Sequence, residues 1–194
     1  LGLDDVIEEV RRWRPDLIGL TATTPVYANA RAMGQRLREA FPDMLIGMGG
    51  VHATVVGREV IDECPWLDFQ VRGEGEAALQ EILAARSAGE GFENVPGVFY
   101  RQDGQVHETP LRPLVQDLDE VPPPARDLLP TELFQHHLPG LGVVKYAGLF
   151  TSRGCPFQCT FCSQHTMYGR KVRWHGVDRV MSELSYIVND LGVG

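Results

Sequence analysis

The first part of the chain alternates between helical and extended hydrophobic periods. Short apolar runs of the kind found in buried strands lie at residues 17–20, 44–48 and 68–72. Apolar residues recur at helical spacing over residues 4–13 and 27–40 and at Val56, Val60 and Ile61. A further helix is expected to open at Gly73-Glu74-Gly75-Glu76 and to stop at Gly89. Because strand, loop and helix alternate three times, the pattern predicts an α/β fold with a parallel sheet, helices on both of its faces, and a ligand crevice at the carboxyl ends of the strands.

The pattern changes after Gly91. Two alternating segments flank Asp103-Gly104, which predicts a β-hairpin that closes the first domain. Prolines then recur up to Pro130 and predict a stiff connector. Beyond it we expect a short helix over residues 131–137, a strand over 146–151 and a helix over 177–191.

These segments predict three parts: an α/β domain at residues 1–110, a proline-rich linker at 111–140, and the start of a further domain at 141–194. The chain begins inside a helical pattern without an initiator methionine and ends one strand-loop-helix unit into the last part. We therefore expect it to be a piece of a longer protein. No apolar run reaches the roughly 18 residues of a membrane helix, so we expect no membrane span.

Composition and charge narrow the class of protein. Of 194 residues, 43% are hydrophobic and 23% are charged, which is typical of a folded globular protein and excludes a disordered chain. The formal net charge is −8, which repels phosphate backbones and anionic lipid. Nucleic acid is therefore not the expected partner.

The cysteines indicate a metal or cluster site. Cys155, Cys159 and Cys162 form a C-x3-C-x2-C array after a predicted strand, whereas Cys64 stands alone and is expected to be a small buried hydrophobic residue. Three thiolates on one loop can hold only three irons of a cubane, whereas an ordinary electron-transfer cubane takes four cysteines. The array therefore predicts either a distant fourth ligand or a cluster whose open iron binds a substrate or cofactor. This clustering favours a reducing compartment, the cytoplasm, over a secreted disulfide scaffold.

This motif resembles the signature of the radical S-adenosylmethionine (SAM) superfamily, including an aromatic residue, Phe161, before the last cysteine. The resemblance implies that Cys155, Cys159 and Cys162 ligate a [4Fe-4S] cluster. It also implies that the open iron chelates SAM, whose adenine lies beside Phe161. One electron, from a donor such as flavodoxin or ferredoxin, would then release a 5'-deoxyadenosyl radical.

A zinc site is the alternative for the same cysteines. His165 completes a C-x3-C-x2-C-x2-H pattern that is chemically adequate for a tetrahedral zinc cage. Zinc ligands more often come as two separated pairs, so the cluster remains the preferred interpretation, with His165 a surface or substrate-side residue. Arg170, Lys171 and Arg173 follow as a basic group that fits either an anionic ligand or a solvated loop.

A second resemblance lies in the first domain. Thr21-Ala22-Thr23 after one strand and Gly49-Gly50 after the next resemble the later part of the cobalamin-binding fold, so the chain is similar to the cobalamin (B12)-dependent radical SAM family, class B methyltransferase-like. The resemblance implies that Thr21, Thr23, Gly49, Gly50 and His52 contact cobalamin. Glycines let a bulky ligand approach the backbone, and small hydroxyls offer hydrogen bonds without filling the crevice.

The match departs from the family pattern in two ways. Thr23 stands where leucine is usual, and the Asp-x-His-x-x-Gly loop that ligates cobalt is not in the chain. Each residue also has a simpler explanation: a Gly-Gly pair is often only a tight turn, and His52 fits an ordinary loop histidine. Glu74 and Glu76 fit helix capping and the helix dipole.

The two resemblances together imply a methyltransferase acting on an unactivated carbon of a small-molecule substrate. One alternative is a cyclisation or rearrangement enzyme of the anaerobic Mg-protoporphyrin monomethyl ester cyclase type. Another is a non-catalytic cobalamin- or zinc-binding module. Because barrel strands that complete the SAM pocket in the family are missing, we expect the chain by itself to be inactive, and its exposed sheet edge makes self-association an expectation.

Overall fold

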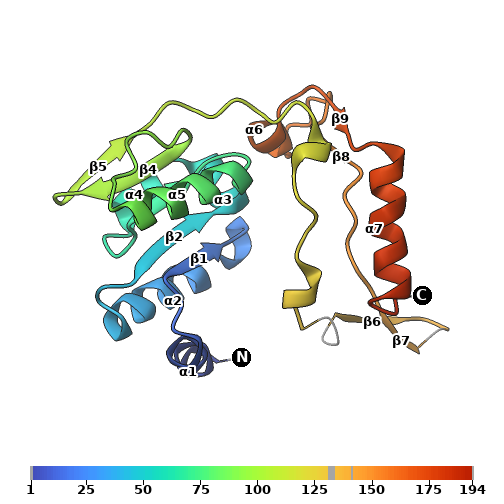
Figure 1. Cartoon of the computed structure of the whole chain (residues 1–194), viewed down its shortest axis with the longest axis horizontal. Coiled ribbons are helices and arrows are strands. Elements are labelled where there is room, and N and C mark those ends of the chain that lie inside the picture. Colours follow the sequence, from blue (N-terminus) through green and yellow to red (C-terminus); the bar gives the residue numbers. More distant parts are fainter. Residues whose placement is uncertain (1, 131–133, 141, 194) are drawn as a thin grey trace. The chain divides into compact units, whose positions relative to one another are not determined.

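A computed structural model describes residues 2–130, 134–140 and 142–193 of the chain. The chain divides into two compact units (Figure 1). The first unit is formed by Leu1–Leu114 with Gln158–Tyr168, and the second by Val115–Phe157 with Gly169–Gly194. The short segment around the last two cysteines therefore packs with the first unit, although it lies far from that unit in the sequence.

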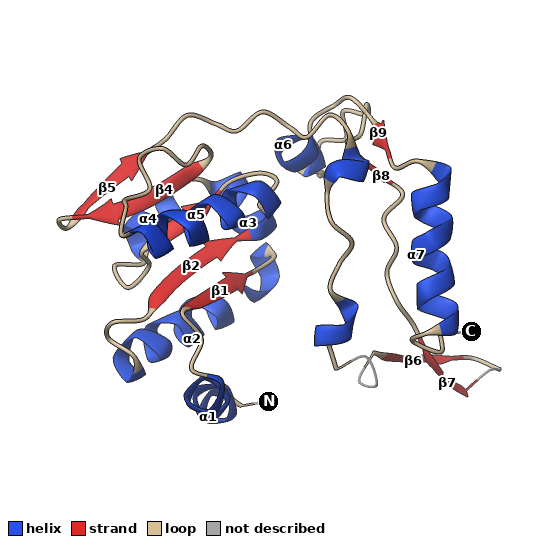
Figure 2. Cartoon of the chain, in the orientation of Figure 1, coloured by secondary structure: helices blue, strands red, loops and turns tan. Residues whose placement is uncertain are grey.

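The first unit is built on a five-stranded mixed sheet (Figure 2). The strand order is β1-β2-β3-β4-β5; β1, β2 and β3 run parallel, and β4 and β5 form an antiparallel hairpin at one side. The strands are β1 (Leu17–Thr21), β2 (Leu45–Gly49), β3 (Phe69–Val71), β4 (Val98–Gln102) and β5 (Gln105–Glu108). The predicted parallel sheet and the hairpin at Asp103-Gly104 are both confirmed.

Helices cover both faces of this sheet. They are α1 (Leu3–Trp13), α2 (Tyr27–Ala40), α3 (Gly50–Val56), α4 (Glu59–Glu63), α5 (Glu76–Ala88) and α6 (Gln164–Tyr168), with a 3-10 turn at Thr24–Val26. In one hydrophobic core, the four helices from α1 through α4 pack against Ile46 and Met48 of β2. In a second core, α5 packs against Phe69 and Val71 of β3. The α/β class with helices on both faces is therefore confirmed.

The predicted helix through Val56, Val60 and Ile61 is wrong as a single element. The backbone breaks at Gly57, whose φ of 77° lies in the left-handed region, and α3 and α4 are separate helices. The fully buried Gln70 side chain stabilises this break, because its Nε2 donates to the carbonyls of Ala53 and Gly57 at 2.7 and 2.8 Å.

The second unit contains two small antiparallel pairs and one long helix. Its elements are two 3-10 turns, η2 (Leu118–Glu120) and η3 (Arg126–Leu128), the strands β6 (Gln135–Leu138), β7 (Gly142–Lys145), β8 (Ser152–Arg153) and β9 (Arg173–Trp174), and α7 (Val177–Asn189). β6 pairs with β7 and β8 with β9. The proline-rich segment packs within this unit, where Leu118 is fully buried and Arg126 forms a 2.7 Å ion pair with Glu183 of α7.

Two predicted elements of this unit are wrong. The segment 134–137 is not helical; its residues enter β6, whose His136 pairs with Val144, while residues 131–133 lie outside the described residues. The predicted strand at 146–151 has no ladder partner in the described part of the chain, and only Ser152 and Arg153 are extended against β9. A strand needs a neighbour, which apolar periodicity alone does not supply.

None of the helices in the described part of the chain has the length and apolar character that a bilayer crossing requires.

Candidate functional site

Two adjacent parallel strands of the first unit carry glycine at matching positions. Gly19 of β1 lies beside Gly47 of β2, and Thr21 lies beside Gly49 one step further along the same face. Phe69 and Val71 of β3 continue this face, and α5 packs on them. At Gly19, Gly47 and Gly49 this face of the sheet carries no side chain, so the cavity can approach the backbone of β1 and β2 there.

A cavity of about 520 Å³ lies over this face. It includes the carboxyl ends of the three parallel strands and the start of α5, and Met167 of α6 also lines it. The glycines in its lining are Gly19, Gly47, Gly49, Gly50, Gly73 and Gly75. Its size suits a small ligand or one arm of a larger one, and its place matches the crevice predicted for a doubly wound sheet.

The glycines that line this cavity are explained in two different ways. A Cβ at Gly50, where φ is 86°, would come within 2.3 Å of Thr21 Oγ1, and a Cβ at Gly47 would come within 2.0 Å of the Phe69 ring. At Gly19 and Gly49 the nearest atoms would be 3.9 and 3.8 Å away. Internal packing does not require glycine at the latter two positions, so their effect is to leave room in the cavity, which fits a bulky ligand such as a corrinoid.

The hydroxyl loop lies at the edge of this region. Thr21 and Thr23 are exposed, and neither belongs to the cavity lining. The Thr21 hydroxyl lies directly beside the Cα of Gly50, so the loop after β1 and the glycine pair after β2 are in contact. The structure thus brings together the two motifs that the resemblance paired, while the roles of Thr21 and Thr23 stay predictions.

His52 is buried among protein groups. Its backbone N–H donates to the Ala22 carbonyl at 3.1 Å, its Nδ1 lies 3.1 Å from Thr24 Oγ1, and its ring stacks on Tyr27 with centroids 3.9 Å apart. These contacts tie the start of α3 to the loop after β1. The cavity lining does not include His52, so its predicted contact with cobalamin stays a prediction.

Sequence reasoning missed part of the cavity lining. Gly19, Gly73, Gly75 and Met167 line the cavity beside the expected Gly49 and Gly50. A usable signal existed for Gly19, because Leu-Ile-Gly occurs at the same register in both strands. Met167 had no such signal, since α6 reaches the first unit only through tertiary packing against α3.

The cysteine loop has a different character. Cys159 is exposed, Cys155 and Cys162 are half-buried, all three thiols are free, and Phe161 is 91% exposed. Backbone bonds shape the loop: the Cys162 N–H donates to the Cys159 carbonyl at 3.3 Å, and the Cys155 N–H donates to the Gly169 carbonyl at 3.2 Å. Gly154 supplies a φ of 94° before the first cysteine.

The donor set suits an iron-sulfur cluster, since three free thiols follow one another within one short loop. Cys155 belongs to the second unit, whereas Cys159 and Cys162 belong to the first. Among the residues that the structure describes, no three His, Cys, Asp or Glu side chains are gathered into a metal-binding group, and this holds for the cysteines with His165 as well.

Cys64 is separate from this loop. It is fully buried in the first core, and its Sγ lies 3.5 Å from the Tyr27 hydroxyl. Burial raises the pKa of the Cys64 thiol, and burial also raises the pKa of Tyr27. The expectation that Cys64 is a buried hydrophobic residue is confirmed.

The basic residues after the loop have structural contacts. Arg170 Nη1 donates to the Phe157 carbonyl at 3.2 Å, and the buried Arg173 donates to the Val115 carbonyl. Lys171 is exposed. These guanidinium groups brace the backbone of the second unit around the loop.

A carboxylate holds the start of α7 in the second unit. Asp119 accepts hydrogen bonds from the Gly176 N–H and from His175 Nδ1, each at 3.1 Å. The Gly176 N–H bond, followed by the His175 bond, lowers the pKa of Asp119. Gly176 is the N-cap of α7, so Asp119 serves as a capping group supplied from the proline-rich segment.

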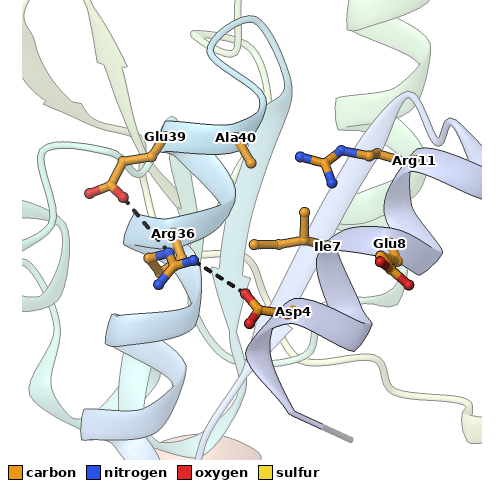
Figure 3. A pocket seen from close by; sticks show the side chains of 7 residues that line it. All are labelled: Asp4, Ile7, Glu8, Arg11, Arg36, Glu39 and Ala40. Carbon is orange, nitrogen blue, oxygen red and sulfur yellow. Dashed lines mark hydrogen bonds and ion pairs between the residues drawn. The ribbon is translucent and has the colours of Figure 1, made fainter.

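A second hollow of about 430 Å³ lies between α1 and α2 (Figure 3). Arg36 forms ion pairs there with Asp4 at 3.3 Å and with Glu39 at 3.9 Å, and Ile7 lies between the charged groups. These exposed charged side chains pair with one another within and between the two helices. The lining of this hollow is therefore charged, whereas the cavity over β1 and β2 is lined mainly by glycine and apolar residues.

Comparisons with known proteins agree with these features. The B12 binding domain family matches residues 2–83. An uncharacterized methyltransferase of Pyrococcus horikoshii is 36% identical over 193 residues, which cover 100% of this chain and 41% of the relative. An anaerobic magnesium-protoporphyrin IX monomethyl ester cyclase of Rubrivivax gelatinosus is 34% identical over 198 residues, covering 100% of the chain and 35% of the relative.

Solved structures share the fold. The cobalamin-dependent SAM radical enzyme OxsB, with aqua-cobalamin and SAM bound, matches 96% of this chain and 25% of its own with a TM-score of 0.77 at 22% identity. The radical SAM methyltransferase TsrM from Kitasatospora setae matches 98% and 39% with a TM-score of 0.71 at 18% identity. The chain thus spans less than half the length of these proteins. Residues 2–83 thus match the B12 binding domain family, and the chain along its length is similar to cobalamin-dependent radical SAM enzymes.

Proposed function

We propose that the intact protein is a cobalamin-dependent radical SAM enzyme that transfers a methyl group to an unactivated carbon of a small-molecule substrate. The observation that carries the proposal is a combination within one chain: a B12-binding match at residues 2–83 and a C-x3-C-x2-C loop at 155–162. The 36% identity with a methyltransferase along the whole chain favours methyl transfer.

The proposal gives the candidate residues separate tasks. Cys155, Cys159 and Cys162 hold a [4Fe-4S] cluster, and Phe161 lies beside the adenine of SAM. Gly49 and Gly50, with the small hydroxyls of Thr21 and Thr23 at the edge, receive part of the cobalamin. When bound, the cluster and SAM supply a carbon radical, and the cobalamin supplies the methyl group.

The chain's own groups prepare these positions. Gly19 and Gly49 leave space against the sheet, and His52 fixes the hydroxyl loop through Ala22 and Thr24. The exposed Cys159 is open to an incoming cluster and to an electron donor such as flavodoxin or ferredoxin. The free thiols suit a reducing cytoplasm.

A second candidate is cyclisation or rearrangement with the same pair of cofactors. It is favoured by the 34% identity with the Rubrivivax gelatinosus cyclase, which extends over the whole chain. The cavity and the cysteine loop serve both reactions equally well, so the distinction depends on the substrate pocket of the intact protein.

The test is anaerobic reconstitution of the chain with iron and sulfide, read by electron paramagnetic resonance of the reduced protein with and without SAM. Cys159→Ala removes one proposed ligand, and Cys64→Ala is the matched control because Cys64 is buried in the first core. Binding of aquacobalamin is measured in parallel by its absorbance after ultrafiltration.

We expect a [4Fe-4S] signal that changes on addition of SAM, is lost in Cys159→Ala and is retained in Cys64→Ala. Retained corrinoid in the same preparation supports the cobalamin part. Stoichiometric zinc without a cluster would reject the radical enzyme and leave a metal- or cobalamin-binding module.

A further inference from the structure

Two of the three loop cysteines are joined by a tight backbone turn. Thr160 and Phe161 are the central residues of this turn, in which the Cys162 N–H donates to the Cys159 carbonyl at 3.3 Å. A turn closed by such a bond holds the Cα atoms of its first and last residues less than about 7 Å apart. A disulfide needs a Cα separation of roughly 4.4–6.8 Å, so the turn brings the backbone of Cys159 and Cys162 into the range that a disulfide requires.

Cys155 is not part of this turn. Its N–H donates to the Gly169 carbonyl at 3.2 Å, and among the described residues no backbone hydrogen bond joins it to Cys159 or Cys162. Cys155 also belongs to the second unit, whereas the other two cysteines belong to the first. The backbone therefore singles out one pair from the three thiols that the loop carries.

The turn lies at the surface, where a small reagent reaches it. Cys159 and Thr160 are exposed, and Phe161 is 91% exposed. Cys162 is half-buried, and both thiols of the pair are free. An accessible thiol that lies next to a second thiol is the arrangement in which the first is oxidised and the second closes a disulfide.

We propose that Cys159 and Cys162 form a modification site, at which a small disulfide such as oxidised glutathione converts the two thiols into an intramolecular disulfide. The Cys159 thiolate attacks one sulfur of oxidised glutathione, forms a mixed disulfide and releases one glutathione thiolate. The Cys162 thiolate then attacks the Cys159 sulfur and releases the second glutathione thiolate. The two protein thiols are thereby oxidised, oxidised glutathione is reduced to two glutathione molecules, and these take up the two thiol protons.

The consequence for cluster loading rests on the proposed function, in which these thiolates ligate iron. The thiolate is the form of cysteine that binds a metal, so the oxidised turn leaves only Cys155 of the three proposed ligands. Loading of the cluster then requires prior reduction of the disulfide, with two electrons supplied by a thiol reductant. The turn thus makes the metal-free loop sensitive to the balance between glutathione and its disulfide.

Simple exposure of Cys159 has a different signature. An isolated exposed thiol remains as a mixed disulfide with glutathione, because no neighbouring thiol displaces the glutathione. Three equivalent thiols on an unshaped loop would instead give a mixture of disulfides in which Cys155 also takes part. The identity of the bond, and not the loss of free thiols, therefore separates the proposed site from general thiol oxidation.

The experiment exposes the reduced, metal-free chain to glutathione buffers of increasing oxidised fraction under anaerobic conditions. The reaction is quenched with acid, the remaining thiols are alkylated, and the products are identified by mass spectrometry of the unreduced chymotryptic digest. Cleavage after Phe157 and Phe161 places Cys155, Cys159 and Cys162 on three different peptides, so each disulfide has its own mass.

Two variants separate the pair from the third cysteine. Cys162→Ser removes the thiol that closes the disulfide, and Cys155→Ser is the matched control because it removes the loop cysteine outside the turn. Circular dichroism of each variant verifies that it is folded. Wild type in the oxidised form, in the reduced form and after treatment with dithiothreitol is then given iron and sulfide, and the initial rate of cluster formation is read by absorbance.

We expect the Cys159–Cys162 disulfide to exceed the glutathione adduct of Cys159 at least about tenfold, both in wild type and in Cys155→Ser, because closure of so short a loop outcompetes a second glutathione. In Cys162→Ser the adduct of Cys159 should become the main product. Oxidation of wild type should lower the initial rate of cluster formation at least about tenfold, and dithiothreitol should restore that rate.

The results that would overturn the inference are distinguishable from failure of the proposed function. If Cys155 enters disulfides as often as Cys162, or if Cys159 of wild type stays as its glutathione adduct, the turn does not determine the pairing and the inference fails. Equal rates of cluster formation in oxidised and reduced wild type would overturn the consequence for loading. If the reduced chain forms no cluster, the cluster part of the proposed function fails, while the digest still decides the modification site.

Discussion

The cavity over the first sheet and the cysteine loop carry the two halves of the candidate chemistry, and they are built in different ways. The cavity is bounded by paired strands and by α5, which rest on two buried cores. The loop has Cys159 and Phe161 exposed and no gathered metal-binding group among the described residues.

The difference follows from where the binding energy comes from. A pocket made of backbone and packed side chains exists before its ligand, because hydrophobic burial has already fixed the strands. Thiolate ligands repel one another until a metal joins them, so the free energy of metal binding also orders the loop that holds the metal. Three predictions test this contrast, from the largest expected effect to the smallest.

The largest effect is expected in thiol labelling of the metal-free chain at pH 8. Cys159 should react with iodoacetamide rapidly, and Cys64 should react more than about a hundredfold more slowly. Cys64 is fully buried, and its raised pKa lowers the thiolate fraction available to the reagent. The labelling time course is followed by mass spectrometry of the digested protein.

Denaturation serves as the control, since all four cysteines should then be labelled at similar rates. Native labelling of Cys64 at the rate of Cys159 would show that the first core opens as readily as the loop.

The next effect concerns glycines on neighbouring strands. Gly47→Ala should destabilise the first unit by about 1–3 kcal/mol, because the new Cβ would lie 2.0 Å from the ring of Phe69, which is 2% exposed and cannot move freely. Gly19→Ala is the matched control and should stay within about 0.5 kcal/mol, since its Cβ would have 3.9 Å of clearance.

The free energy of unfolding of both variants is measured by urea denaturation and compared with that of the wild type. Equal destabilisation by the two substitutions would mean that Gly19 also supports internal packing, and the space over β1 would then not be reserved for a ligand.

The smallest effect concerns the cap of α7 in the second unit. The pKa of Asp119 is lowered in the folded state from an ordinary value of 3.8, so its contribution to stability is fully present above that value. The contribution is lost as the pH falls through the lower folded pKa. We therefore expect Asp119→Asn to be less stable than wild type at pH 6, with the difference shrinking below about pH 4.

The thermal midpoints of the two proteins, measured from pH 6 to pH 2, give this difference directly. A difference that stays constant over this range would assign the cap to side-chain shape instead of charge.

The sequence predicted an element correctly where the residues of that element alone carry its hydrophobic period or its turn. α2 at Tyr27–Ala40 and α7 at Val177–Asn189 follow the helical period of their apolar residues, and the β4–β5 hairpin follows from Asp103-Gly104. It failed at β6 and at residues 146–151, where strand formation depends on whether a partner is available. Gly57 shows a third case, in which a left-handed glycine interrupts a pattern that remains helical on both sides.

The residues of the candidate site fall into the same two groups, those predicted from a local motif and those placed only by tertiary packing. The spacing of Cys155, Cys159 and Cys162 and the two motifs of the first domain were legible in the sequence, because each is a short segment with its own chemical signature. The sequence did not predict that Gly19 and Met167 line the cavity. It also did not predict that His52 is buried against Ala22 and Tyr27.

The sequence by itself determined the α/β alternation, the cysteine array and the kinship with cobalamin-dependent radical SAM proteins, since backbone periods and local motifs are properties of neighbouring residues. Only the tertiary structure decided that Gly19 and Gly47 share one open face, that α6 joins the first unit and that Glu76 borders the cavity. These features depend on strand register and on packing between distant segments, which no local pattern specifies.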